Sequence, residues 1–233
     1  MSKSNPSILL IGASRGLGLA MAEEFAKRGW RVVGTVRQTG RTGLSDLAER
    51  HPDRVTVERL DITDAGQIAA LGSGLAGSVF DVLFVNAGVA NASPHETIAE
   101  TTDAEFVRVM LTNALGPMRA VEGLETLVRG DGLIGVMSSG QGSIANNLKG
   151  GHEVYRGSKA ALNQYMRSYA ARRADGARAL VLMAPGWIRT DLGGPQATFG
   201  IEETIPQLVD TLIAEQGTAG LRFIDRFGET VPW

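Results

Sequence analysis

Short apolar runs of strand length recur along the whole chain, and segments with helical spacing lie between them. Most of these runs are continuous rather than alternating with polar residues, which is typical of strands covered on both faces. A regular alternation of strand and helix predicts an α/β fold, in which a doubly wound parallel sheet of about seven strands carries helices on both faces. The predicted strands are Ile8–Ile11, Val32–Val36, Val55–Leu60, Val82–Val85, Leu133–Met137, Ala179–Met183 and Leu221–Ile224.

Length and composition narrow the class of protein further. The 233 residues contain no linker, repeat or low-complexity block, so a single domain spanning residues 1–233 is expected. The 23 Lys and Arg residues nearly balance the 25 Asp and Glu residues, which argues against broad nucleic-acid binding. Cysteine is absent, which excludes disulfides, thiolate metal sites and cysteine nucleophiles. No apolar run approaches the roughly 20 residues of a membrane helix, so a cytoplasmic protein without a membrane partner is expected.

A glycine-rich turn directly follows the first predicted strand and leads into a helical pattern. The turn reads Gly12-Ala13-Ser14-Arg15-Gly16-Leu17-Gly18. Glycines at such a turn allow a tight bend, let the backbone approach a pyrophosphate, and let the helix pack on its strand. The N-terminus of that helix offers N–H groups to the same anion. The turn therefore predicts a Rossmann-type dinucleotide site, although a glycine cluster alone also fits a simple tight turn.

The second predicted strand ends without the acidic residue that usually binds the free ribose of NAD. Arg37 follows this strand, and no acidic residue occurs between it and Asp46. Arg15 lies inside the glycine turn, and two guanidinium groups suit a 2′-phosphate because arginine forms forked hydrogen bonds. This pattern predicts that NADP(H) is preferred over NAD(H), and the alternative is that both arginines are solvated surface residues. Arg41, in a glycine-rich loop, is a further candidate to reach the phosphate.

Polar residues also follow the third and fourth predicted strands. Asp61 is a candidate to bind the adenine amino group, and Thr63 or Asp64 is a candidate cap of the next helix. Asn86 is placed to brace the neighbouring glycine turn, and Gly88 would let the cofactor ribose approach closely. Each of these residues on its own is more often structural than ligand-binding.

Tyr155 and Lys159 lie four residues apart in a helical pattern, so they share one helix face. A free tyrosine has a pKa of about 10, and a neighbouring ammonium lowers that pKa because it favours the phenolate. The pair would then supply a proton to a nascent alkoxide near neutral pH. An isolated pair of this kind is more often a surface tyrosine beside a surface lysine. Here Ser139 follows the fifth predicted strand at the same sheet edge, and Asn113 lies on the preceding helix.

Taken together, these motifs resemble the short-chain dehydrogenase/reductase family. The resemblance covers nearly the whole chain, with the motifs in the family order. Within the family it is strongest to the small C-factor and sniffer-type carbonyl reductases. The motifs shared with that group are Tyr155-Arg156-x-Ser158-Lys159-Ala160-Ala161-Leu162-Asn163, Pro185-Gly186-Trp187 and the terminal Val231-Pro232-Trp233.

The resemblance implies a role for each matching residue. Tyr155 would be the general acid/base, Lys159 would lower its pKa and hold the nicotinamide ribose, and Ser139 would bind the substrate oxygen. Asn113 would hold a water in a proton relay through Lys159, and Thr190 would bind the carboxamide. The implied cofactor-binding residues are Gly12, Ser14, Arg15, Gly16, Leu17, Gly18, Arg37, Asp61, Ile62, Asn86, Ala87, Gly88, Tyr155, Lys159, Pro185, Gly186, Trp187, Ile188 and Thr190.

Three assignments stay open in the sequence. The loop that follows Ser139 is longer than is usual in the family, so Ser143 is a rival for the serine role; Ser139 is preferred because it lies where the strand ends, whereas Ser143 lies farther out on the loop. Trp187 is either a wall of the nicotinamide pocket or a packed core side chain. His95 and His152 lie in separate, isolated loop positions, so surface histidines are expected rather than a metal site.

The resemblance implies an NADP(H)-dependent oxidoreductase that reduces a carbonyl to an alcohol, or runs the reverse reaction, by hydride transfer with Tyr155 as general acid/base. The alternative is a non-catalytic NADP(H)-binding regulator of the C-factor type, and the intact catalytic set favours the enzyme. A small-molecule carbonyl or alcohol is the expected partner, and no metal ion is expected. The family also implies a homodimer or homotetramer, formed through helices at about 103–128 and 154–173. The identity of the substrate stays open.

Overall fold

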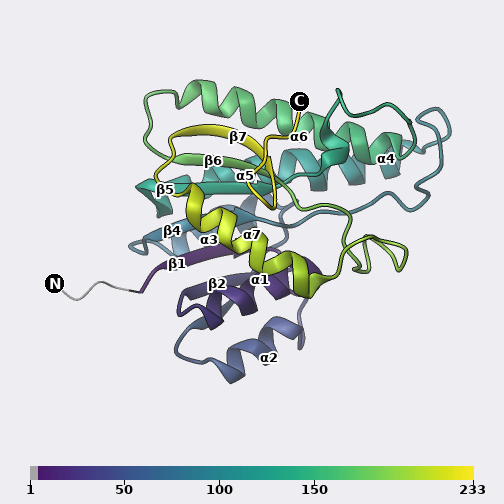
Figure 1. Cartoon of the computed structure of the whole chain (residues 1–233). Helices are drawn as coiled ribbons and strands as arrows, with labels where there is room; N and C mark the ends of the chain where they lie inside the picture. Colours follow the sequence, from purple (N-terminus) through teal and green to yellow (C-terminus); the bar gives the residue numbers. More distant parts are fainter. Residues whose placement is uncertain (1–4) are drawn as a thin grey trace.

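The computed structural model describes residues 5–233, so residues 1–4 of the predicted domain lie outside the described residues. Its strands are β1 (Ser7–Ile11), β2 (Arg31–Val36), β3 (Val55–Arg59), β4 (Phe80–Val85), β5 (Val128–Met137), β6 (Ala179–Ala184) and β7 (Gly220–Asp225). They form one sheet in the order β3-β2-β1-β4-β5-β6-β7, with every pairing parallel (Figure 1). The predicted doubly wound α/β fold is confirmed.

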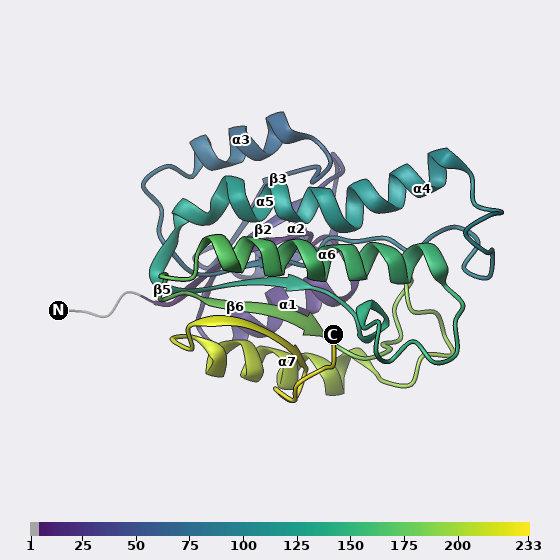
Figure 2. The same cartoon turned by 90° about the horizontal axis from the view of Figure 1, so that it is seen from above.

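Helices join the strands and cover both faces of this sheet. The α-helices are α1 (Gly16–Lys27), α2 (Gly43–Arg50), α3 (Ala65–Gly74), α4 (Asp103–Met110), α5 (Gly116–Leu124), α6 (Glu153–Arg172) and α7 (Ile201–Glu215). Short helical turns are η1 (Leu111–Leu115), η2 (Glu125–Leu127) and η3 (Gly140–Gly142). Helices α1, α2 and α7 cover one face, and α3, α5 and α6 cover the other (Figures 1 and 2).

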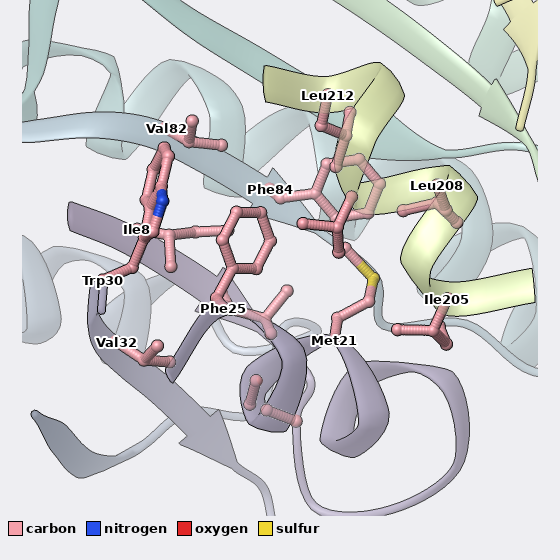
Figure 3. Packing of buried hydrophobic residues seen from close by; sticks show 14 of the residues in the cluster. Ile8, Met21, Phe25, Trp30, Val32, Val82, Phe84, Ile205, Leu208 and Leu212 are labelled. Carbon is pink, nitrogen blue, oxygen red and sulfur yellow. The ribbon is translucent and has the colours of Figure 1, made fainter. Parts of the chain in front are cut away.

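Two hydrophobic cores lie on the two faces of the sheet, because successive strand residues point in opposite directions. In β1, Ile8 and Leu10 pack toward α1, α2 and α7, whereas Leu9 and Ile11 pack toward α3, α5 and α6. Figure 3 shows the first of these cores, where side chains of α1 and α7 meet those of the central strands. Burial on both faces explains why the strands read as continuous apolar runs.

The expected single helix at about 103–128 is interrupted. The π-helical turn η1 separates α4 from α5, and β5 already begins at Val128, ahead of the predicted strand start. Pro117 in the first turn of α5 has no N–H, so the regular bonding pattern of an α-helix cannot continue through it. Within residues 5–233, no helix combines the length and apolar character needed to cross a membrane.

Candidate active site

The glycine turn between β1 and α1 forms a backbone cradle at the carboxyl edge of the sheet. Gly12 has a φ of 88°, and a Cβ there would stand 2.8 Å from the Cβ of Ala87. A Cβ on Gly18 would stand 2.0 Å from the Gly12 carbonyl oxygen. Asn86 Nδ2 donates to that carbonyl at 2.8 Å, so Asn86 braces the turn as predicted, and Gly12 N–H donates to Thr35 Oγ1 at 2.9 Å. Neither Gly12 nor Gly18 has room for a side chain.

The remaining residues of the turn include a glycine in the left-handed region. Gly16 has a φ of 57°, and the nearest atom to a Cβ there is Cγ2 of Thr190, at 4.0 Å. The turn therefore lies beside the segment that follows β6. Ser14 and Leu17 are half-buried, and Ile62 is buried beneath the same edge.

The three candidate arginines have different partners. Arg15 pairs with Asp191, on the segment after β6, at 2.5 Å, and both side chains are mostly exposed. Arg41 pairs with two carboxylates of α2, Asp46 at 2.6 Å and Glu49 at 2.7 Å. Arg37 is exposed and forms no ion pair with any of residues 5–233. Of the three, Arg37 is the cation that the described chain leaves without an acidic partner.

The end of β3 supplies an aspartate that is partly engaged. Asp61 Oδ1 accepts hydrogen bonds from the N–H of Thr63 at 2.9 Å and from its hydroxyl at 2.7 Å. Asp64 is the cap of α3, since its carboxylate accepts from two N–H groups of the first turn. Asp61 therefore keeps a fixed orientation, with Oδ2 accepting no hydrogen bond from the described residues.

Lys159 lies at the centre of the site and is 3% exposed. Its Nζ donates to the carbonyl of Met137 at 2.9 Å and lies 5.8 Å from the ring centroid of Tyr155. A Cβ on Gly88 would stand 3.5 Å from this Nζ and 3.4 Å from Oδ1 of Asn113. The loop directly after β4 therefore lies against both Lys159 and Asn113.

Asn113 is fully buried in η1, and its side chain is occupied. Its Oδ1 accepts from the N–H of Val89 at 2.8 Å, and its Nδ2 donates to the carbonyl of Val89 at 2.8 Å and to Oγ of Ser158 at 3.0 Å. Because Pro117 has no N–H, the main-chain carbonyl of Asn113 lacks the donor that an α-helix supplies four residues later. The regular α-helical hydrogen bond to that carbonyl is therefore absent, and the side chain is fully engaged.

Tyr155 and Ser139 meet where β5 ends and α6 begins. Burial raises the pKa of Tyr155 above its ordinary value, so the predicted lowering of this pKa by Lys159 is wrong, and only the neighbouring Ser139 side chain partly opposes the rise. The Ser139 hydroxyl also accepts from the N–H of Gln141 at 3.1 Å, which fixes it at the start of η3. Tyr155 is therefore a neutral phenol at neutral pH, with one hydroxyl group beside it.

Ser143 is buried and faces its own loop. Its Oγ accepts from the N–H of Asn146 at 3.1 Å, so the hydroxyl serves the turn that follows η3. Packing explains the burial, because a Cβ on Gly142 would stand only 3.0 Å from the backbone of Lys159. The loop is held against α6, and the Ser143 hydroxyl is engaged within it.

The segment after β6 carries the predicted carboxamide-binding residue. Trp187 is 53% exposed, and its indole N–H donates to the carbonyl of Gly193 at 2.8 Å, so it is not a packed core side chain. Thr190 Oγ1 accepts from the N–H of Gly193 at 3.0 Å. Buried Ile188 forms an isolated parallel bridge with Phe199, which ties the two ends of the segment together.

The two histidines are not isolated, contrary to the sequence-based expectation. The rings of His95 and His152 lie 5.6 Å apart, although separate loops carry them. His152 precedes α6 with a φ of 51°, and burial, together with the neighbouring side chains of His95 and Arg156, lowers its pKa. No cluster of three or more His, Asp or Glu residues suited to a metal ion occurs between residues 5 and 233.

Removing the buried charge of Lys159 is expected to stabilise the protein at neutral pH. Burial lowers the pKa of Lys159 from 10.5 to about 8, so folding opposes its protonation, and stability is lost as pH falls from 10.5 through 8. The stability lost in this way amounts to about 3 kcal/mol at pH 7. The hydrogen bond from Lys159 to the Met137 carbonyl offsets about 1 kcal/mol of that loss. We therefore expect Lys159→Met to raise the free energy of unfolding by about 2 kcal/mol at pH 7.

Urea unfolding at pH 7 and pH 10.5 measures this effect, with Lys149→Met at an exposed lysine as the control. The gain from Lys159→Met should shrink toward zero at the higher pH, because wild-type Lys159 is then neutral. An equal gain at both pH values would contradict the electrostatic explanation.

Comparison with known proteins places this arrangement in a family. A family model described as enoyl-(acyl carrier protein) reductase matches residues 12–211. A solved short-chain dehydrogenase/reductase from Burkholderia multivorans with bound NADP is 61% identical, with a TM-score of 0.97, over 99% of this chain and 100% of that chain. A carbonyl reductase from Pseudomonas aeruginosa PAO1 in complex with NADP is 34% identical, with a TM-score of 0.91, over the same shares.

Over a shorter region, the chain is also similar to a curated protein named C-signal. The C-signal protein of Myxococcus xanthus is 34% identical over 155 residues, which cover 66% of this chain and 92% of that protein. The family model spans most of the chain, and the structural similarity extends over nearly all of it. On this evidence the chain belongs to the short-chain dehydrogenase/reductase family.

Proposed function

We propose that this protein is an NADP(H)-dependent oxidoreductase that interconverts a small carbonyl compound and its alcohol. The observation that carries the proposal is the placement of a neutral, half-buried Tyr155 beside Ser139 and the buried ammonium of Lys159 at one sheet edge. The Burkholderia and Pseudomonas relatives with bound NADP support the choice of cofactor. When bound, NADPH supplies the hydride for the carbonyl carbon.

The described residues fit this cofactor. The cradle left by Gly12 and Gly18 exposes backbone N–H groups at the start of α1, which suits a pyrophosphate. Along the same edge, Asp61 and Ile62 would bind the adenine, and Asn86, Ala87 and Gly88 would border the ribose. Beyond β6, the residues that would hold the nicotinamide are Pro185, Gly186, Trp187, Ile188 and Thr190.

The chain's own residues would carry the proton. Tyr155 donates its phenolic proton to the substrate oxygen as the carbonyl carbon is reduced, and Ser139 orients that oxygen by a hydrogen bond. The ammonium of Lys159 stabilises the phenolate that remains. The proton then returns to Tyr155 through Lys159 from a water held by the main-chain carbonyl of Asn113, because the Asn113 side chain is occupied.

The decisive experiment is NADPH consumption by the purified protein with a panel of aldehydes, ketones, diketones and quinones. Turnover of at least one carbonyl class would support the oxidoreductase and begin to define its substrate. Tight NADPH binding with no turnover across the panel would instead favour a non-catalytic NADP(H)-binding regulator. The similarity to C-signal is the observation that favours this alternative.

Arg37→Ala is expected to weaken NADPH binding by about 10- to 100-fold and to leave NADH binding unchanged. The reason is that hydrogen bonds to a charged group contribute about 1.5–3 kcal/mol, and only NADPH carries the 2′-phosphate. Isothermal titration calorimetry with both cofactors measures the effect. Arg31→Ala, at the opposite end of β2, is the matched control. An unchanged NADPH affinity would show that Arg37 does not hold the phosphate.

Replacing Ser139 and replacing Ser143 are expected to have different effects on kcat. Ser139→Ala should lower kcat by about 10²-fold, because one hydrogen-bond donor to the reacting oxygen is lost. Ser143→Ala should keep near wild-type kcat, because the Ser143 hydroxyl serves its own loop. Steady-state kinetics with one accepted carbonyl measures both variants. The reverse pattern, with activity lost only in Ser143→Ala, would show that the wrong serine was assigned.

A further inference from the structure

Arg226, directly after β7, is a buried cation without an acidic partner. It is 8% exposed, and it forms no ion pair with any residue of the described range 5–233. Its Nε donates to Oε1 of Gln207 at 3.0 Å, and its Nη1 donates to the carbonyl of Pro185 at 3.0 Å. The adjacent carboxylate of Asp225 accepts instead from the backbone N–H of Phe227 at 2.9 Å. Buried charges are normally paired with an opposite charge, so this arrangement needs a local explanation.

Two aromatic rings enclose the guanidinium group of Arg226. Its central carbon lies 3.9 Å from the ring centroid of Phe199 and 4.4 Å from that of Phe227. Cation–π contacts of this kind offset part of the desolvation cost without neutralising the charge. The guanidinium is therefore accommodated as a cation whose direct contacts are all neutral groups.

The same guanidinium group links both ends of the segment that carries Thr190. At one end it binds the carbonyl of Pro185, and at the other it stacks on Phe199. Gly186 lies between these contacts with a φ of 98°, and a Cβ there would stand 2.6 Å from Nη1 of Arg226. The guanidinium thus fills the space directly behind the Pro185-Gly186 turn, where any larger residue at position 186 would displace it.

We propose that Arg226 is a positioning residue for the nicotinamide pocket, and that its unneutralised charge makes this pocket favour the reduced cofactor. The inference rests on the proposed function, because it takes Pro185, Gly186 and Thr190 as nicotinamide-binding. The oxidised nicotinamide ring carries a positive charge, whereas the reduced ring is neutral. A fixed cation behind the pocket wall repels only the oxidised form, and burial weakens the screening of that repulsion.

The test compares three ligands by isothermal titration calorimetry. NADPH and NADP⁺ differ in ring charge, and 2′,5′-ADP carries the adenosine and the 2′-phosphate without a nicotinamide. The variants are Arg226→Met, which removes the charge but keeps an unbranched side chain, and Arg226→Lys, which keeps the charge but loses the planar fork.

We expect wild type to bind NADPH about tenfold more tightly than NADP⁺, and Arg226→Met to lose most of that ratio. Arg226→Lys should retain the ratio, and both variants should bind 2′,5′-ADP as wild type does. Equal affinities of wild type for NADP⁺ and NADPH would overturn the inference. This comparison needs no variant, so it remains decisive even if Arg226→Met does not fold. An unchanged ratio in a folded Arg226→Met variant would also overturn it. A wild-type protein that binds neither NADPH nor 2′,5′-ADP would contradict the proposed function instead.

Discussion

Tyr155→Phe is expected to lower turnover of every accepted carbonyl by about 10³-fold while NADPH binding changes little. The substitution removes one oxygen atom and keeps the ring that packs near Lys159. Because burial raises the pKa of Tyr155, the wild-type phenol keeps its proton at neutral pH. Phenylalanine leaves the substrate oxygen without a proton donor, so kcat falls rather than cofactor affinity. Single-turnover oxidation of NADPH, followed by absorbance, measures the chemical step directly.

Tyr165→Phe is the matched control, because Tyr165 lies on the same helix but is exposed. It should keep wild-type turnover. The pH dependence gives a second reading of the same site. Reduction should slow as pH rises above about 8, because buried Lys159 then loses the charge that stabilises the phenolate. Wild-type-like turnover in Tyr155→Phe would exclude Tyr155 as the general acid.

The fold was predictable because two-sided burial leaves a clear pattern in the sequence. The run Ile8–Ile11 has no polar residue, since each of its four side chains enters one of the two cores. The order of the strands in the sheet, by contrast, depends on contacts between distant segments, so no single apolar run predicts it. The early start of β5 at Val128 was missed because the residues before Leu133 include Arg, Gly and Asp.

The candidate site was predictable as far as it follows the strand ends. Residues such as Arg37, Asp61 and Asn86 lie just after parallel strands, and the carboxyl ends of such strands share one edge. Their roles as ligands remain predictions. Local pattern did not reveal the interruption at η1, although Pro117 was a usable signal for it.

Contacts between distant loops could not be predicted from the pattern of the sequence. Arg226 lies 41 positions from Pro185, whose carbonyl it binds, and nothing in its neighbourhood distinguishes it from a surface arginine. The paired rings of His95 and His152 come from loops that α4, α5, β5 and the short helical turns between them separate in the chain. Such pairs depend on the path of the folded chain, which the periodicity of the sequence does not encode.

Gly18→Ala is expected to weaken NADPH binding by about 100-fold or more and to lower stability by about 1–3 kcal/mol. The added Cβ would stand 2.0 Å from the Gly12 carbonyl oxygen and 2.6 Å from Nδ2 of Asn86, the two groups joined by the hydrogen bond that braces the turn. Gly12 has little room to retreat, because it already lies against Ala87. The turn must therefore open, and its N–H groups move away from the position that a pyrophosphate requires.

Gly74→Ala, at the end of α3, is the matched control for this prediction, because nothing lies within 4 Å of a Cβ there. It should keep wild-type affinity and stability. Calorimetric titration with NADPH and urea unfolding measure both variants. If Gly18→Ala folded stably and bound NADPH as wild type does, the glycine turn would not be the pyrophosphate site, and the placement of the cofactor along this sheet edge would have to change. Loss of affinity in a variant that remains folded would instead support the placement of the pyrophosphate at the turn, since the added Cβ displaces the turn backbone itself.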